Sequence, residues 1–212
     1  MRKILAVLAL VMMPAAGAQT AADRLFDAID EGKALVAEGI VARGQVDLAA
    51  RNKDGETALH LAIENDMKEL AALLVKAGAR VNARNRNSDT PLHAAALHED
   101  VYYAELLLAA KADPNLRNDD GESPLHWAVL TGNLATARAM LERGADPKVK
   151  DLQGNTLLHF AADGGNEHLV SAFLSLGVDP RERNREGKRA LEVARARGFE
   201  PVVKLLERFE KD

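Results

Sequence analysis

A motif that returns every 33 residues constrains this chain more than any other feature of its sequence. Each copy has a hydroxyl residue, a leucine two positions later and a histidine three positions later. The copies are TALH (57–60), TPLH (90–93), SPLH (123–126) and TLLH (156–159), and RALE (189–192) falls on the next step. A period of this length predicts a row of small units, each of which needs its neighbours to bury an apolar face.

Every unit also carries the signals for two helices. The hydroxyl residue suits the N-terminal cap of a first helix, and Pro91 and Pro124 take the next position, where a missing N–H costs nothing. Gly78, Gly144 and Gly177 suit the left-handed residue that ends a second helix. We therefore expect helix pairs joined by short turns.

In period, motif and phase together, the chain resembles the ankyrin repeat. The resemblance implies an all-α solenoid of stacked helix-turn-helix units with β-hairpin-like turns, in about six repeats including the caps. The expected boundaries are an N-terminal capping repeat at 19–51, four full repeats at 52–84, 85–117, 118–150 and 151–183, and a C-terminal capping repeat at 184–212.

Residues 1–18 have the features of a secretory signal peptide. A basic start at Arg2 and Lys3 precedes ten apolar residues and the small-residue end Ala16-Gly17-Ala18. An apolar run of this length covers only about half of a hydrocarbon layer of roughly 30 Å, which argues against a membrane-spanning helix. We expect cleavage after Ala18, no stable membrane insertion afterwards, and a mature chain in the bacterial periplasm. An uncleaved N-terminal anchor is the alternative.

Composition and motifs argue against chemistry on this chain. The absence of cysteine excludes thiol nucleophiles, disulfides and zinc fingers, and a formal charge of −4 argues against nucleic-acid binding. His60 and Glu64 are four residues apart, as an acid–base pair can be, but no nucleophile or cofactor motif accompanies them. We expect no enzyme, no catalytic residue and no cofactor.

The four motif histidines invite a metal-site hypothesis. Packed helices lie about 8–10 Å apart, whereas zinc ligand atoms lie about 2 Å from the metal, so histidines of adjacent units cannot share one ion. The resemblance implies instead that they form hydrogen bonds within the repeat and to the next turn. The set is His60, His93, His126 and His159.

A second periodic row is basic. Two interpretations are open: a surface for an acidic or phosphate-bearing partner, or pairing with nearby acids such as Asp54, Asp120 and Glu186. We favour the pairing. The row is Arg51, Arg84, Arg117, Lys150 and Arg183.

The resemblance also implies where a partner protein would bind, namely the hairpin tips and the concave face of the first helices. Glu56, Asp89 and Glu122 would form an acidic strip. Together with Leu97 and Leu130 it gives the apolar centre and charged rim that protein interfaces present. Repeat 85–117 departs most from the pattern, since Ser88 and Lys111 replace glycines, and a left-handed lysine costs about 1 kcal/mol. The expected partner-binding residues are Glu56, Arg86, Asp89, Asp120 and Glu122 on the hairpins, and Leu97, His98, Leu130 and Thr131 at the helix ends.

The function expected from sequence is non-enzymatic binding of another protein in the periplasm, by a chain that is monomeric when free. Two specific roles are open. One is an immunity protein or inhibitor of an exported toxin or lipase. The other is an accessory factor for a periplasmic enzyme, such as one of oxidative-stress defence. A small enzyme built on helical repeats is the competing class.

Overall fold

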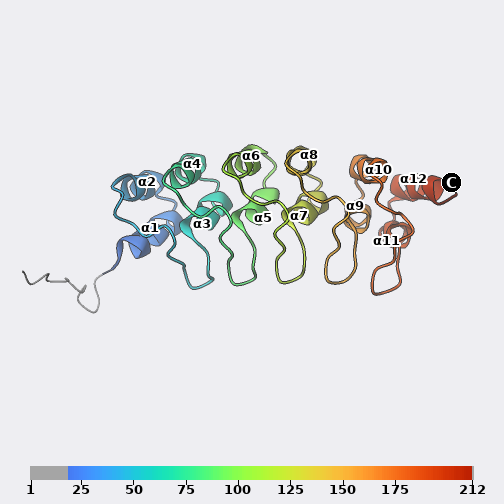
Figure 1. The fold of residues 1–212 in the computed structure, drawn as a ribbon, viewed down its shortest axis with the longest axis horizontal. Coiled ribbons are helices and arrows are strands. Elements are labelled where there is room, and N and C mark those ends of the chain that lie inside the picture. The colour runs from blue at the N-terminus through green and yellow to red at the C-terminus, as the bar shows by residue number, and fades with distance from the viewer. Residues whose placement is uncertain (1–18, 212) are drawn as a thin grey trace, which may run out of the picture.

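The computed structural model describes residues 19–211, which form an elongated row of helix pairs (Figure 1). The segment expected to be a signal peptide, residues 1–18, lies outside this range. The described residues hold twelve α-helices and one isolated antiparallel bridge, Lys150 to Thr156. The helices are α1 (Ala21–Asp30), α2 (Ala34–Ala42), α3 (Ala58–Glu64), α4 (Lys68–Lys76), α5 (Pro91–Ala96), α6 (Tyr102–Ala109), α7 (Pro124–Leu130), α8 (Leu134–Glu142), α9 (Leu157–Asp163), α10 (Glu167–Ser175), α11 (Ala190–Arg197) and α12 (Glu200–Lys211).

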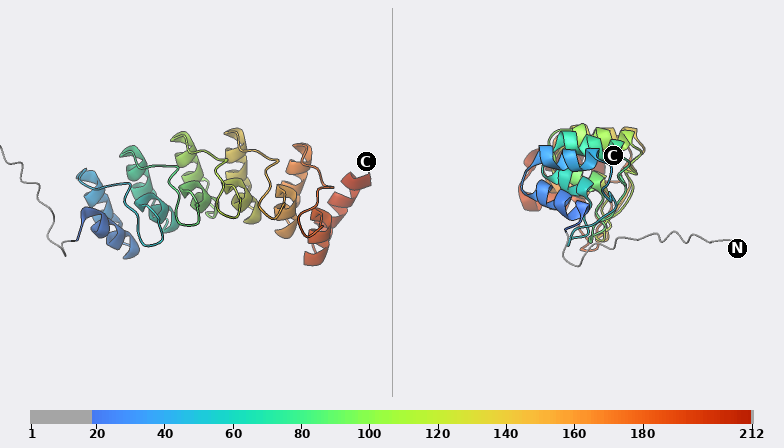
Figure 2. Two further views of the ribbon diagram at one scale, coloured as in Figure 1. Left: turned by 60° about the horizontal axis from the view of Figure 1, so that its bottom comes forward. Right: turned by 90° about the vertical axis from the view of Figure 1, so that its left-hand side faces the viewer.

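The helices form two rows, and the hairpin loops project from one edge. The odd-numbered helices make the inner row, next to the loops, and the even-numbered helices make the outer row (Figures 1 and 2). From α3 onward, neighbouring inner helices pack more closely than neighbouring outer helices do. The inner helices and the hairpins therefore lie on the concave side of the stack, which confirms the predicted all-α solenoid.

The repeated motif sets the start of each inner helix. Thr57, Thr90, Ser123 and Thr156 adopt extended backbone conformations, and helices α3, α5, α7 and α9 begin at the next residue. In each case the Nδ1 atom of the motif histidine accepts a hydrogen bond from the backbone N–H of the cap residue, at 2.9–3.2 Å. The histidine thus satisfies a donor that the helix leaves unpaired.

Leucine and alanine on the inner helices make the shared core. The motif leucines and the alanines three positions later are almost completely inaccessible to solvent. The small alanines allow neighbouring helices to pack closely, and Tyr103 of α6 is fully buried in the same core. These core residues are Leu59, Leu92, Leu125 and Leu158 with Ala62, Ala95, Ala128 and Ala161.

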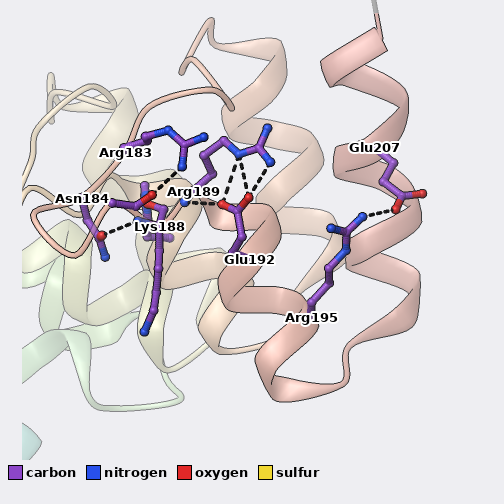
Figure 3. Close-up of polar contacts among 9 residues, drawn as sticks. Arg183, Asn184, Lys188, Arg189, Glu192, Arg195 and Glu207 are labelled. Carbon is purple, nitrogen blue, oxygen red and sulfur yellow. Dashed lines mark hydrogen bonds and ion pairs between the residues drawn. The ribbon is translucent and has the colours of Figure 1, made fainter.

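The two ends of the stack differ. At the first unit, Leu35 and Val36 of α2 are 83% and 52% exposed, so this unit presents apolar surface outward. At the last unit, Arg195 of α11 pairs with Glu207 of α12 at 2.6 Å, and charged side chains cover the end (Figure 3). No helix among residues 19–211 is both long and apolar enough to span a membrane.

Three residues other than glycine among those described take left-handed conformations: Asp66, with φ of 54°, and two that stand where the other full repeats all have glycine. Lys111 has φ of 67° and Ser88 has φ of 64°, whereas glycine stands at the equivalent positions of the other full repeats. The expectation of a left-handed Lys111 is confirmed, and both positions carry backbone strain.

Candidate functional site

Three of the four motif histidines link their own helix cap to the next hairpin. Their Nε2 atoms lie 3.2 Å from the carbonyl oxygen of Asp89 (His60), 3.1 Å from that of Glu122 (His93) and 2.9 Å from that of Lys188 (His159). Because Nδ1 is bound to the cap, both ring nitrogens are engaged. The expected hydrogen-bonding role is confirmed for these three histidines.

His126 is the exception. Its ring is fully buried, and Nε2 has no hydrogen-bond partner. Burial lowers the pKa of His60 and of His126 to about 4, so both rings are neutral near pH 7. The expectation of a bond to the next turn is wrong for His126.

No three histidine or acidic side chains in residues 19–211 come together as ligands for one metal ion.

The basic row binds backbone carbonyls. Arg84 donates to the carbonyl of Arg117 at 2.9 Å, and Arg117 in turn donates to the carbonyl of Lys150 and, at 2.6 Å, to that of Gly121. Arg51 and Arg183 reach the carbonyls of their own hairpins in the same way, at 2.5 Å.

The predicted pairing of this row with Asp54, Asp120 and Glu186 is therefore wrong. A guanidinium presents several donors in one plane, so it can connect the carbonyls of two adjacent hairpins. Lys150 has no guanidinium and so lacks that geometry. It is the residue of the row that pairs with a nearby acid, Glu182, at 2.9 Å. The row joins the hairpins of neighbouring units.

The expected acidic strip is partly internal. Asp89 is only 8% exposed and accepts hydrogen bonds from the side-chain amides of Asn85 at 3.3 Å and Asn118 at 2.9 Å. Its carboxylate joins two hairpins and faces little solvent. Glu56 and Glu122 are half-buried and stay accessible from the concave side.

Glu64, at the end of α3, adds a titratable group to this face. Partial burial, together with the nearby carboxylate of Glu56, raises the pKa of Glu64 to about 7. A side-chain hydrogen bond between the two carboxyl groups adds to the raised pKa of Glu64.

The hairpin tips are held edge to edge by their backbones. The N–H of Arg86 donates to the carbonyl of Asp54 at 3.1 Å, and the N–H of Leu152 donates to that of Asp120 at 2.8 Å. The tips of neighbouring units therefore move together, and the Arg86 side chain projects from a fixed loop.

Exposed leucines gather where the inner helices end. Leu97 is 55% exposed and Leu130 is 46% exposed. Leu97, His98 and Thr131 line one shallow pocket of about 270 Å³ with Leu134, which is 43% exposed. The structure thus brings three of the predicted residues together.

A larger groove lies on the concave side between α7 and the last unit. It has a volume of about 660 Å³, and its walls include Leu130, Phe160 and Val193 together with the carboxylates of Glu122 and Asp151. Of the predicted residues, Glu122 and Leu130 line it.

Comparison with known proteins agrees with this architecture. The family described as "Ankyrin repeats (3 copies)" matches the chain over residues 25–118, 84–151 and 125–211. The chain belongs to the ankyrin-repeat family. The crystal structure of the ankyrin repeat domain of Bcl-3, described as a unique member of the IkappaB protein family, is similar with a TM-score of 0.74 and 31% identity, over 87% of this chain and 85% of that one. No match is found among curated proteins.

Ankyrin repeats are protein–protein interaction modules, which directs attention to surface residues that the repeat itself does not need. Sequence reasoning missed Leu134, Asp151 and Phe160. Asp151 carried a signal, because asparagine occupies its position in the other units (Asn52, Asn85, Asn118 and Asn184). Leu134 and Phe160 carried none, since their exposure depends on how far adjacent units separate.

Proposed function

We propose that this ankyrin-repeat chain is exported to the periplasm and binds another protein there through its concave face, without catalysing a reaction. The observation that carries the proposal is the exposure of three leucines, each 43–55% exposed: Leu97 and Leu134 line the shallow pocket, and Leu130 lines the larger groove. Contiguous exposed apolar surface with a charged rim is the usual mark of a protein interface.

The binding test compares two matched double substitutions. Leu97→Arg with Leu130→Arg adds two charges to the concave face, whereas Leu176→Arg with Phe209→Arg adds two charges at exposed positions of the outer row and last helix. The partner is captured from a periplasmic extract on the immobilised wild-type protein. We expect the concave pair alone to lose the partner, with helicity and melting unchanged. Equal capture by both pairs would reject the concave site.

Export rests on the sequence of residues 1–18. Expression of the full chain in a bacterium, followed by fractionation and intact-mass measurement, tests it. We expect a periplasmic product that begins at Gln19. A product that stays in the cytoplasm contradicts export, whereas an exported product that keeps Met1 contradicts cleavage and supports the uncleaved anchor.

The absence of catalysis is supported by the environment of His60, the histidine of the His60–Glu64 pair. His60 is buried with both ring nitrogens engaged, so it cannot take a proton from a substrate. A purified protein with turnover that disappears in His60→Gln or Glu64→Gln would overturn this part of the proposal.

Deletion of the gene distinguishes the two possible roles of this binding, inhibition of a toxin or lipase and assistance of a periplasmic enzyme. An inhibitor or immunity protein predicts that deletion of the gene is harmful only while a toxin or lipase is made by a neighbouring gene. An accessory factor predicts that deletion lowers the activity of a periplasmic enzyme with no toxin present.

A further inference from the structure

The groove on the concave side has unbalanced negative charge. Two of its carboxylates have cationic partners inside it: Asp163 pairs with Arg197 at 2.6 Å, and Glu186 pairs with Lys188 at 2.7 Å. Glu122 and Asp151 form no ion pair with any lysine or arginine of residues 19–211. The groove therefore keeps two uncompensated carboxylates.

Asp151 contributes one of these carboxylates at a position where the other units carry asparagine, and Asn155 stands where the three preceding units carry an acid. At the equivalent junctions the asparagine amide donates to the preceding hairpin: Asn118 Nδ2 to the Asp89 carboxylate at 2.9 Å, and Asn184 Nδ2 to the Asn155 amide oxygen at 2.8 Å. Asp151 has no N–H to donate to the preceding hairpin. Its carboxylate accepts from the backbone N–H of Asn155 at 2.7 Å and from the Asn155 side-chain amide at 2.8 Å, and it lines the groove together with Glu122. Burial, followed by the neighbouring carboxylates of Asp120 and Asp151, raises the pKa of Glu122.

A buried polar atom beside the same groove also lacks a partner. In the other three motif histidines Nε2 lies against the carbonyl of the residue 29 positions later. The corresponding residue for His126 is Asn155, which lines the groove, and there the bond is not made. The fully buried Nε2 atom is thus unsatisfied, a state that native structures rarely keep without a reason, although His126 does not itself line the groove.

Aromatic and apolar side chains form the wall next to the two carboxylates. Trp127 donates its indole N–H to Glu122 at 2.6 Å, and the Phe160 ring packs edge-on against His126 with 4.9 Å between ring centroids. Both aromatic side chains are half-buried, and Leu130 is exposed beside them. A flat cation with an apolar stem suits such a place, because it can stack on a ring while it pairs with carboxylates.

We propose that this groove binds an arginine side chain of the partner protein, with the guanidinium between Glu122 and Asp151 and the stem along Leu130 and Phe160. The inference rests on the proposed protein-binding function and specifies the chemistry of its partner. Arginine fits better than lysine because its planar fork can donate to both carboxylates at once and stack on an aromatic face.

The only tryptophan of the chain, Trp127, reports directly on this site. Its fluorescence is followed during titration with the peptide acetyl-Gly-Arg-Gly-Arg-Gly-amide. A peptide with citrulline in place of arginine has the same shape without the charge, and a lysine peptide has the charge without the planar fork. We expect saturable binding of the arginine peptide, and affinities about tenfold or more weaker for the other two.

Asp151→Asn is the sharpest variant, because it removes one of the two carboxylates, keeps the shape of the side chain and can still accept from the backbone N–H of Asn155. Its melting temperature is measured alongside, because the acceptor of the Asn155 side-chain amide changes. We expect it to weaken arginine-peptide binding by about tenfold, and to weaken it further when combined with Glu122→Gln. Glu69→Gln with Glu105→Gln, at exposed positions of α4 and α6, removes the same charge as that double variant and should change nothing.

Two results would overturn the proposal: equal weakening by the control pair, which indicates unspecific charge attraction, or equal affinity for the arginine and citrulline peptides. The protein-binding function has a separate outcome. If capture of the partner depends on Leu97 and Leu130 but is unchanged in Asp151→Asn, the arginine site fails and the binding function stands. If capture does not depend on the leucines, the concave binding function itself fails.

Discussion

Lys111 stores strain that its equivalents in other repeats avoid. Its φ of 67° lies in the left-handed region, where Gly78, Gly144 and Gly177 stand in the other units. A side chain in this conformation costs about 1–2 kcal/mol, because Cβ approaches the following carbonyl oxygen. The lysine is kept at an exposed position, so nothing in the core depends on it.

Lys111→Gly is therefore expected to stabilise the protein by about 1 kcal/mol, measured as the free energy of unfolding in urea. Lys76→Gly, in the last turn of α4 where the conformation is helical, should destabilise it by about 1 kcal/mol. A loss of stability in Lys111→Gly would show that the lysine side chain makes a contact worth more than the strain.

The buried histidines give the stability a pH dependence with a definite sign. Burial lowers the pKa of His60 and His126 from 6.5 to about 4, so their contribution is fully present above pH 6.5 and is lost as the pH falls toward 4. Glu64 acts in the opposite sense, because its raised pKa gives stability that is lost as the pH rises from 4.5 toward 7. Glu64 is partly exposed, so solvent screening makes its effect the smaller one.

We expect the free energy of unfolding to be lower at pH 5 than at pH 7, with each of the two rings contributing about 2 kcal/mol to the difference. Urea unfolding at the two pH values measures it. His126→Gln, which cannot become protonated, should show a smaller difference than the wild type. A protein that is more stable at pH 5 contradicts the assignment of neutral buried rings.

At the scale of elements, the arginine row joins the hairpins that the helices alone leave separate. Arg117 spans two of them, with Nε on the Gly121 carbonyl at 2.6 Å and Nη2 on the Lys150 carbonyl. A charged donor to a carbonyl contributes about 1.5–3 kcal/mol when it is shielded from water, and less when exposed. The contribution depends on the shape of guanidinium, which a lysine cannot reproduce.

Arg117→Lys should accordingly destabilise the protein by about 1–2 kcal/mol, and the loss should persist in 1 M NaCl because no carboxylate is involved. Arg138→Lys is the control. Its pairing with Glu142 at 2.8 Å within α8 is largely exposed, and the substitution should cost no more than about 0.5 kcal/mol. If Arg117→Lys and Arg138→Lys lowered the free energy of unfolding equally, Arg117 would contribute no more than an exposed surface charge.

The sequence predicted the features that recur in every unit, and it missed the features that depend on contacts between neighbouring units. Period and capping residues give α3, α5, α7 and α9 their starts, because those signals are local. The burial of Asp89 and the unsatisfied Nε2 of His126 depend on distances between neighbouring units. The groove beside Asp151 arises in the same way, so a substitution visible in sequence acquires meaning only once Glu122 is seen to face it.

A stack in which each unit contacts only its neighbours should open from its ends. Within residues 19–211 the first unit has a neighbour on one side only, and it exposes Leu35 and Val36. The last unit is closed by charged contacts between α11 and α12 and by Arg189, whose side chain and backbone N–H both bind Glu192 (Figure 3). In such a stack, opening costs least where the fewest interfaces are lost.

Native-state hydrogen exchange therefore should show the fastest amide exchange in α1 and α2, slower exchange in α11 and α12, and the slowest in α5 and α7 at the centre. Leu92→Ala, in the buried centre, should lower global stability by about 2–5 kcal/mol and speed exchange throughout. Leu35→Lys, at a position that is 83% exposed, should leave both unchanged, because no packing is lost there. Uniform exchange along the wild-type chain would mean that the units open as a single cooperative body, so that the terminal interfaces are as strong as the central ones.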